Sequence, residues 1–257
     1  MRASSEVQLE ALDWQGRPLR CQDCPHEDMH AEGRCDLGTV CVADRRHKRI
    51  DNFFRRNAEL AARYLDHPYF EVRVLAAKHA SVFLLPALLA DPEPDVRAMV
   101  ARRLPASRIG PLKSDPEPDV RIAVADRLEG AALVPLLSDE DYRVRRAAVR
   151  RAPLDALIYS LHDPETEVRR DVARRVEGRT LARMAQDPDP LVRVIVAERL
   201  PEGALTPLRD DDDMRVRFAV AERAGDADLA VLADDPVPEI SELARTRLRR
   251  SNDSAEQ

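Results

Sequence analysis

A valine recurs along this chain at a constant step of 24 residues, and in seven successive copies an arginine follows it directly. The anchors are Val72, Val96, Val120, Val144, Val168, Val192 and Val216, and an eighth copy at Ile240 keeps the phase without the arginine. No insertion or deletion disturbs this step. Such regularity is typical of a solenoid, in which each small unit stacks on its neighbours and does not fold alone.

Each anchor is predicted to open an α-helix of about three turns. Apolar residues stand four and eight positions after the anchor, as in Val120, Val124 and Leu128, and spacing by four places them on one helical stripe. The fifth position is mostly alanine, which lets neighbouring helices approach closely. The start of each helix is marked by a turn such as Asp91-Pro92-Glu93-Pro94-Asp95. Its second proline suits the first helical position, and its acidic residues favour the positive end of the helix dipole.

A shorter second element follows each anchor helix. Leucine or another large apolar residue stands 13 and usually 16 positions after the anchor, as in Leu133 and Leu136. Only about seven residues separate the end of one long helix from the next Asp-Pro turn, which is enough for one or two turns of 3₁₀ helix. Neither alternation nor runs of β-branched residues appear there, so we expect an all-α chain of about eight repeats.

The four cysteines of the chain lie together near its N-terminus, outside the repeats. Their spacing is Cys21-x₂-Cys24-x₁₀-Cys35-x₅-Cys41, and Gly33 and Gly38 are expected to supply turns between them. Clustered thiols in a reducing compartment favour metal ligation over disulfides. Four thiolates suit either a tetrahedral zinc ion or an iron–sulfur cubane, and the spacing alone leaves both open. We interpret the nearby His26, His30 and His47 as surface residues or neighbours of the ligands.

The 24-residue period, the Asp-Pro turns, the Val-Arg anchors, the paired leucines and the four-cysteine segment together resemble the leucine-rich repeat variant proteins. The similarity covers nearly the whole chain. It implies alternating α and 3₁₀ helices in two layers, wound into a right-handed superhelix. It also implies a [4Fe-4S] cluster in the N-terminal domain, and it leaves the biochemical role of the family open. Zinc, which the cysteine spacing also allows, is kept as the alternative metal.

Two rows of arginine accompany the anchors. One stands directly after each valine and the other seven positions after it, as Arg97 and Arg103 do in the second repeat. For the first row we favour a structural ladder with the aspartates that stand five residues before each anchor, such as Asp91 and Asp115. The second row has no equally regular acidic partner, so its arginines are open to binding phosphate or an acidic partner.

We expect three parts: a four-cysteine cluster domain at 1–49, a repeat solenoid at 50–250 and a polar tail at 251–257. A helix over 50–65 is expected to cap the first repeat, because the end of a solenoid must be covered. The basic segment 45–49 is either a docking site for an acidic redox partner or a solvated surface, and the second interpretation is favoured.

The charge, the aromatic content and the motifs of the sequence make some classes of function less plausible than others. The net charge is −6 and aromatic residues make up 4% of the chain, which disfavours a nucleic-acid partner bound through stacking. No secretory signal and no membrane-spanning segment are evident, so we expect a cytoplasmic protein. No nucleotide-binding loop or nucleophile elbow is present, and four cysteines would fill all four irons of a cluster, so no catalytic residues are assigned. The expected function is electron transfer or redox sensing by the cluster, with the solenoid binding a protein. A non-redox scaffold with a structural metal and a nucleic-acid binder are the alternatives.

Overall fold

The regular structure of the chain is helical. The computed structural model describes residues 11–255, and the side chains of residues 11–251. Within those residues the β-structure is limited to two isolated bridges, Leu12 with Pro18 and Asp36 with Val40. The predicted all-α class is therefore confirmed. The chain divides into two compact units, Met1–Leu128 and Glu129–Gln257, and each is described by itself.

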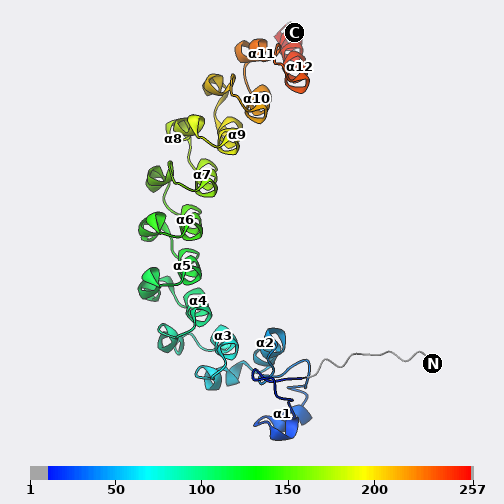
Figure 1. Cartoon of the computed structure of the whole chain (residues 1–257), viewed down its shortest axis with the longest axis vertical. Helices are drawn as coiled ribbons and strands as arrows, with labels where there is room; N and C mark the ends of the chain where they lie inside the picture. The colour runs from blue at the N-terminus through cyan, green and yellow to red at the C-terminus, as the bar shows by residue number, and fades with distance from the viewer. Residues whose placement is uncertain (1–10, 256–257) are drawn as a thin grey trace, which may run out of the picture. The chain divides into compact units, whose positions relative to one another are not determined.

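The first unit contains the cysteine segment, a cap and the first three repeats. Neighbouring α-helices from α2 to α5 pack in one layer, and the 3₁₀ helices between them form a second layer (Figure 1). The elements are η1 (Cys21–Asp23), α1 (Glu27–Ala31), α2 (His47–Arg56), η2 (Ala58–Tyr64), α3 (Phe70–His79), η3 (Leu85–Leu88), α4 (Pro94–Arg103), η4 (Ala106–Arg108), η5 (Gly110–Ser114) and α5 (Pro118–Ala125).

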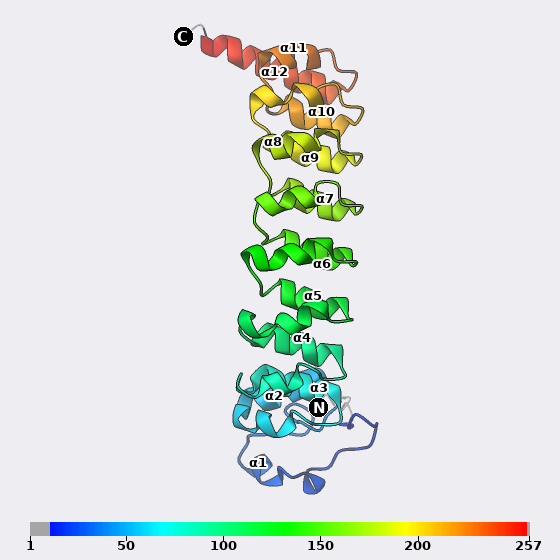
Figure 2. The same ribbon diagram turned by 90° about the vertical axis from the view of Figure 1, so that its left-hand side faces the viewer.

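The second unit continues the same alternation. Within it, α6, α7, α9, α10 and α12 carry the anchors and pack in sequence, as the turned view in Figure 2 shows. The elements are η6 (Gly130–Ser138), α6 (Tyr142–Val149), η7 (Asp155–Ser160), α7 (Thr166–Ala173), α8 (Gly178–Ala182), η8 (Arg183–Gln186), α9 (Pro190–Arg199), η9 (Glu202–Ala204), η10 (Thr206–Leu208), α10 (Met214–Ala221), α11 (Asp226–Leu232) and α12 (Pro238–Ala255). None of the described helices combines the length and the apolar character needed to cross a bilayer.

The hydrophobic core of each unit follows the sequence stripe. The anchors from Val96 to Val216 and Ile240 have no exposed surface, and Leu133 of the second layer is equally buried. Burying one such side chain stabilises the fold by about 1.5–3 kcal/mol. Because every repeat contributes the same few side chains, the core is shallow and continuous within a unit.

The second layer departs from pure 3₁₀ structure in two repeats, at α8 and α11. Proline lies within η3, η5, η6 and η10, where it limits the backbone to short turns. By contrast, α11 has the sequence Asp-Ala-Asp-Leu-Ala-Val-Leu, which has no proline and favours a regular α-helix.

Two expected boundaries differ from the structure. The predicted cap helix over 50–65 is divided into α2 and η2, because Asn57 between them leaves the helical region with φ −134° and ψ 53°. The expected polar tail at 251–257 starts as helix, since α12 continues to Ala255. Residues 256–257 lie outside the described residues, as do residues 1–10 of the expected cluster domain.

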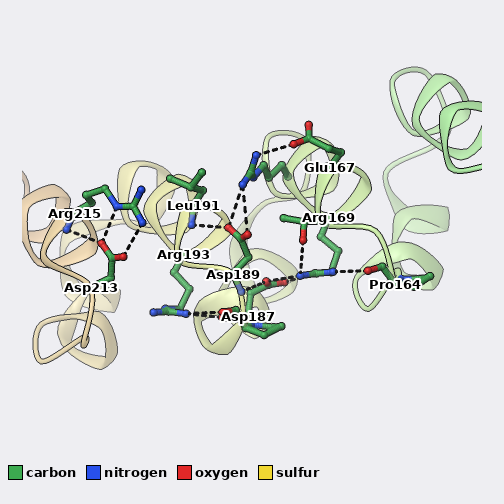
Figure 3. Close-up of polar contacts among 12 residues, drawn as sticks. Pro164, Glu167, Arg169, Asp187, Asp189, Leu191, Arg193, Asp213 and Arg215 are labelled. Atoms are coloured by element: carbon green, nitrogen blue, oxygen red, sulfur yellow. Dashed lines mark hydrogen bonds and ion pairs between the residues drawn. The ribbon is translucent and has the colours of Figure 1, made fainter.

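The first arginine row forms the predicted ladder in both units. Arg97 Nε and NH2 donate to the two carboxylate oxygens of Asp115 at 2.7 and 2.8 Å. The same bidentate pair recurs at Arg73–Asp91, Arg145–Asp163, Arg169–Asp187, Arg193–Asp211 and Arg217–Asp235. Each aspartate also accepts the backbone N–H two residues later, as Asp187 does from Asp189 at 2.9 Å (Figure 3). One carboxylate therefore fixes the turn of its own repeat and binds the preceding repeat.

The second arginine row caps helices. Arg199 NH1 donates to the carbonyl oxygens of Ala173 and Val176 at 2.5 and 2.8 Å, which belong to the preceding repeat. Arg103, Arg175, Arg223 and Arg247 make the equivalent contacts. These carbonyls at the helix end lack partners within the helix, and a cation there also favours the negative end of the dipole. The regular partner of this row is thus backbone, which a search for acidic side chains could not find.

Candidate metal centre

Short turns carry the four cysteines. Cys21 opens η1, and Cys24 follows its end, where the Cys24 N–H donates to the carbonyl oxygen of Cys21 at 3.0 Å. Cys35 follows the turn after α1, and Cys41 precedes α2. Gly33 and Gly38 have φ of 71° and 97°, so both predicted turns are present in a conformation that favours glycine.

All four cysteines line one cavity. The cavity is small, with a volume of about 30 Å³. Apolar side chains form much of the remaining wall, among them Leu19, Leu37 and Val40. All four thiols are free and partly buried. The structure therefore brings together the predicted ligand set from a stretch of the chain with little regular structure.

The surroundings of three of these sulfurs, those of Cys21, Cys35 and Cys41, favour the protonated thiol over the thiolate. Burial raises the pKa of the Cys21 and Cys35 thiols, and the neighbouring cysteines raise it further. Burial raises the pKa of Cys41 to about 11, although the backbone N–H groups of Ala43 and Asp44 hydrogen bond to its sulfur and oppose the shift. A bound metal centre would reverse this balance, because thiolates gain stability beside positive charge and metal binding releases protons.

Aromatic side chains close one side of the cavity. His26 lines it, and its Nε2 hydrogen bonds to the hydroxyl of Tyr64 in η2. The His26 ring packs at 5.4 Å from that of Phe53 in α2. The other two predicted neighbours lie farther out: His30 Nδ1 contacts the Cys35 carbonyl oxygen at 3.3 Å, and His47 Nδ1 lies 3.8 Å from Glu71.

The basic segment 45–49 is not a uniform cationic surface. Arg49 is buried and forms an ion pair with the more deeply buried Asp44 at 2.5 Å. The Asp44 carboxylate also accepts the Arg46 N–H at 2.9 Å, and the Arg49 carbonyl oxygen accepts the Cys41 N–H at 3.2 Å. Part of this charge run therefore holds the loop that carries Cys41.

The donor set fits a thiolate-ligated centre in chemistry and in burial. Four sulfurs, an apolar wall and N–H groups aimed at one sulfur are features that iron–sulfur sites use. Among residues 11–251, no group of three or more histidine, cysteine, aspartate or glutamate side chains forms a ready-made ion site. The thiols share a cavity without forming a closed ligand shell, and their ligation of a metal stays a prediction.

Comparison with known proteins shows which family this region resembles. Residues 11–63 match the family model described as "LRV protein FeS4 cluster", a range that includes the four cysteines, α2 and most of η2. The chain is 54% identical over 85 residues to an uncharacterized 27.7 kDa protein in the nifB 3′ region of Rhodobacter capsulatus. That match covers 33% of this chain and 35% of the relative, so the chain spans about a third of that relative's length.

A solved structure matches over the repeats as well. It is described as a leucine-rich repeat variant with a novel repetitive protein structural motif. The match has a TM-score of 0.84 and 39% sequence identity, and it covers 90% of this chain and 99% of the solved chain. The expected architecture and the expected resemblance are therefore confirmed together, and this chain belongs to the leucine-rich repeat variant family.

Proposed function

We propose that this protein carries a [4Fe-4S] cluster on Cys21, Cys24, Cys35 and Cys41, and that the cluster transfers electrons or senses redox state. The observation that carries the proposal is the convergence of four free thiols on one apolar-walled cavity. The match of this region to an iron–sulfur family model supports it. When bound, the cluster would supply a one-electron carrier whose potential depends on hydrogen bonds to sulfur and on solvent exposure.

The protein's own residues set that environment. The N–H groups of Ala43 and Asp44 place partial positive charge beside the Cys41 sulfur, which favours its thiolate form. Leu19, Leu37 and Val40 limit access of water to the cavity. His26 and Tyr64 shield the side that faces α2 and η2.

Purification without oxygen tests this proposal. We expect a brown protein that contains iron and acid-labile sulfide, and we expect dithionite to bleach its visible absorbance. A colourless protein that contains zinc would contradict the proposal and favour the non-redox scaffold. A brown protein that dithionite does not bleach would retain the cluster but contradict the redox function.

We further propose that the repeats bind an acidic protein partner. Arginines of both rows bind groups of the chain itself, which favours a protein partner elsewhere on the repeats over a nucleic-acid partner on the second row. Further arginines, outside the two rows, lie at two neighbouring helices of the second unit: Arg146 in α6 with Arg150 directly after its end, and Arg170 in α7 with Arg174 directly after its end. At the equivalent positions of α9, Val194 and Glu198 stand instead.

These four arginines form a basic surface in an acidic protein, and three of them already bind carboxylates. Arg146 Nε and Arg174 NH1 both donate to Asp171 at 2.9 Å. Arg170 NH1 donates to Glu167 at 2.7 Å, whereas its Nε is buried without a partner. A partner that presents carboxylates would complement this surface, because its carboxylates would form further charge-assisted hydrogen bonds with the arginines.

A comparative pull-down tests the partner. We expect proteins captured by the anaerobically purified chain to be lost with the double variant Arg150→Ala/Arg174→Ala and kept with Arg102→Ala, which removes an exposed arginine of α4. Capture that is equal for all three proteins would contradict the assigned surface. Retention of RNA or DNA that falls steeply with salt would favour the nucleic-acid alternative instead.

A further inference from the structure

Asn57 lies between the cysteine segment and the repeats. Both the amide nitrogen and the amide oxygen of its side chain are hydrogen bonded. It has no exposed surface. Its Nδ2 donates to the carbonyl oxygens of Arg34 and Phe53 at 3.1 and 3.0 Å, and its Oδ1 accepts from Arg34 Nε at 3.0 Å. An amide side chain offers two donor hydrogens and one carbonyl acceptor, so a buried asparagine with all of them engaged is held in one orientation.

The residue that Asn57 holds stands directly before Cys35. Asn57 binds both the backbone and the side chain of Arg34. The N–H groups of Arg34 and Cys35 in turn donate to the Met29 carbonyl oxygen at 2.9 and 3.4 Å. Arg56, the neighbour of Asn57, donates to the Gly33 carbonyl oxygen at 3.3 Å. The backbone that places the Cys35 sulfur is thus fixed from the C-terminal end of α2.

The same residue determines how the chain leaves α2. The Asn57 N–H donates to the Phe53 carbonyl oxygen, and the Asn57 carbonyl oxygen accepts from the Leu60 N–H at 3.0 Å, which starts η2. The backbone of Asn57 is outside the helical region, so it separates α2 from η2. η2 packs directly on α3, the helix of the first repeat. A displacement of Asn57 would therefore reach the first repeat through η2.

Cys41 provides a comparison within the same site. Its backbone is held from the opposite end of α2, where Arg49 accepts the Cys41 N–H. Arg49 is bound to the buried Asp44 and has no hydrogen bond to η2 or α3 among the contacts of the described residues. Of these two cysteine loops, the one carrying Cys35 has the direct hydrogen-bonded link to η2.

We propose that Asn57 is a positioning residue that couples Cys35 to the repeats: when Cys35 is bound to the cluster, Asn57 transmits that order to η2 and α3. This inference rests on the proposed cluster. Fixing Cys35 fixes Arg34, and Arg34 fixes the Asn57 amide by contacts with both of its ends. Because Asn57 defines the α2–η2 junction, a loose Cys35 loop leaves η2 with fewer constraints and lowers the free energy needed to open it.

A double-mutant cycle measured by hydrogen exchange tests the coupling. The full chain is purified without oxygen as wild type, Cys35→Ser, Asn57→Ala and the double variant, and amide exchange is followed in 58–64 and 70–79. Iron and sulfide are measured in the same samples. We expect Cys35→Ser to accelerate exchange in 58–64 by about fivefold or more in the wild-type background, within the range typical of coupled sites. In the Asn57→Ala background, we expect the same change to have little further effect.

Controls separate coupling from a general loss of stability. Asn52→Ala removes another hydrogen bond between α2 and the cysteine segment, from Asn52 Nδ2 to the Thr39 carbonyl oxygen at 3.2 Å, and we expect it to leave the effect of Cys35→Ser intact. If Asn57→Ala does not fold, Asn57→Asp keeps the size and the acceptor of the side chain and removes both donors. Additive effects of Cys35→Ser and the Asn57 variant, with iron and sulfide present in the wild type, would overturn the coupling and leave the proposed function standing. A wild-type chain without iron and sulfide would overturn both.

Discussion

The cysteine segment and the repeats both bury charged and polar groups, but they specify these contacts in different ways. In the repeats one ion pair recurs at a constant separation of 18 residues, as between Arg97 and Asp115. In the cysteine segment each contact occurs once and at its own separation, 5 residues for Asp44–Arg49 and 23 residues for Arg34–Asn57. A repeated contact leaves a pattern in the sequence, whereas a unique contact does not.

This difference also affects stability. Every repeat contributes its own buried stripe, its own pair and its own cap, so the stability of a repeat array is close to a sum of similar terms. The cysteine segment has few buried apolar residues, among them Met29, Val40 and Val42. Small domains with such limited cores usually need disulfides or a metal centre. We expect the two regions to respond differently to loss of the proposed cluster and to loss of ladder contacts.

The largest expected effect is on the proposed cluster. Replacing Cys24 by serine should abolish the visible absorbance and the bound iron and sulfide, because one of four ligands is lost. The far-ultraviolet circular dichroism should change little, because the repeat helices bury their own core. A global loss of helicity would show that the repeats depend on the cluster and would remove the contrast between the regions.

The ladder should matter most within the repeats. The side chains of Arg97 and Asp115 are 11% and 4% exposed, and breaking a buried ion pair by removing one partner costs roughly 3–5 kcal/mol. We expect Arg97→Ala to lower the free energy of unfolding by about 3 kcal/mol in urea denaturation. The matched variant Arg102→Ala, five residues along the same helix and exposed, should change it by less than about 0.5 kcal/mol. Equal effects of the two variants would refute the ladder as a stabilising device.

Acid should weaken the contact between the cap and the first repeat. Burial alone would raise the pKa of Asp51, but hydrogen bonds from Lys78 and His79 at 2.8 and 2.9 Å lower it to about 2. A carboxylate with a lowered pKa in the folded state stabilises the protein above its unfolded pKa of about 3.9, and this contribution is lost as the pH falls toward 2.

The contribution of Asp51 is about 2 kcal/mol, from a shift of nearly two pKa units. Asp51→Asn should therefore destabilise the chain at pH 7 and flatten the fall in stability between about pH 4 and pH 2. Asp95→Asn, which changes an exposed carboxylate in the first turn of α4, serves as the control. Denaturation curves that fall equally steeply for Asp51→Asn and the wild type would contradict this assignment.

The smallest expected effect is on the helix caps. Arg199→Ala leaves the carbonyl oxygens of Ala173 and Val176 without their cationic donor, and each of the two hydrogen bonds contributes about 0.5 kcal/mol at this part-exposed site. We expect a loss of about 1 kcal/mol in urea denaturation, compared with almost none for the exposed neighbour Glu198→Ala. A loss in the free energy of unfolding as large as that caused by Arg97→Ala would mean that the two arginine rows contribute equally to stability.

How much could be predicted from the sequence depends on whether a feature is repeated along the chain or occurs once. The anchors, the prolines that begin α4, α5, α9 and α12, and the Asp–Arg ladder were predictable because each occurs several times in one phase. The second arginine row was not assigned, because its partners are carbonyl oxygens that every residue carries. The break of the cap at Asn57 was also missed, because an asparagine inside a helical pattern carries no sign that its side chain will bind another loop.

For this protein the sequence by itself determined the repeat length, the all-α architecture and the set of four cysteines. Those features depend on local periodicity and on residue type, which are visible along the chain. Only the tertiary structure decided that the four sulfurs share one cavity, that the second arginine row binds carbonyl oxygens of the preceding repeat, and that Asn57 holds the backbone beside Cys35. These contacts join residues far apart in sequence, and their geometry is fixed only when neighbouring repeats stack and when α2 and η2 pack beside the cysteine loops.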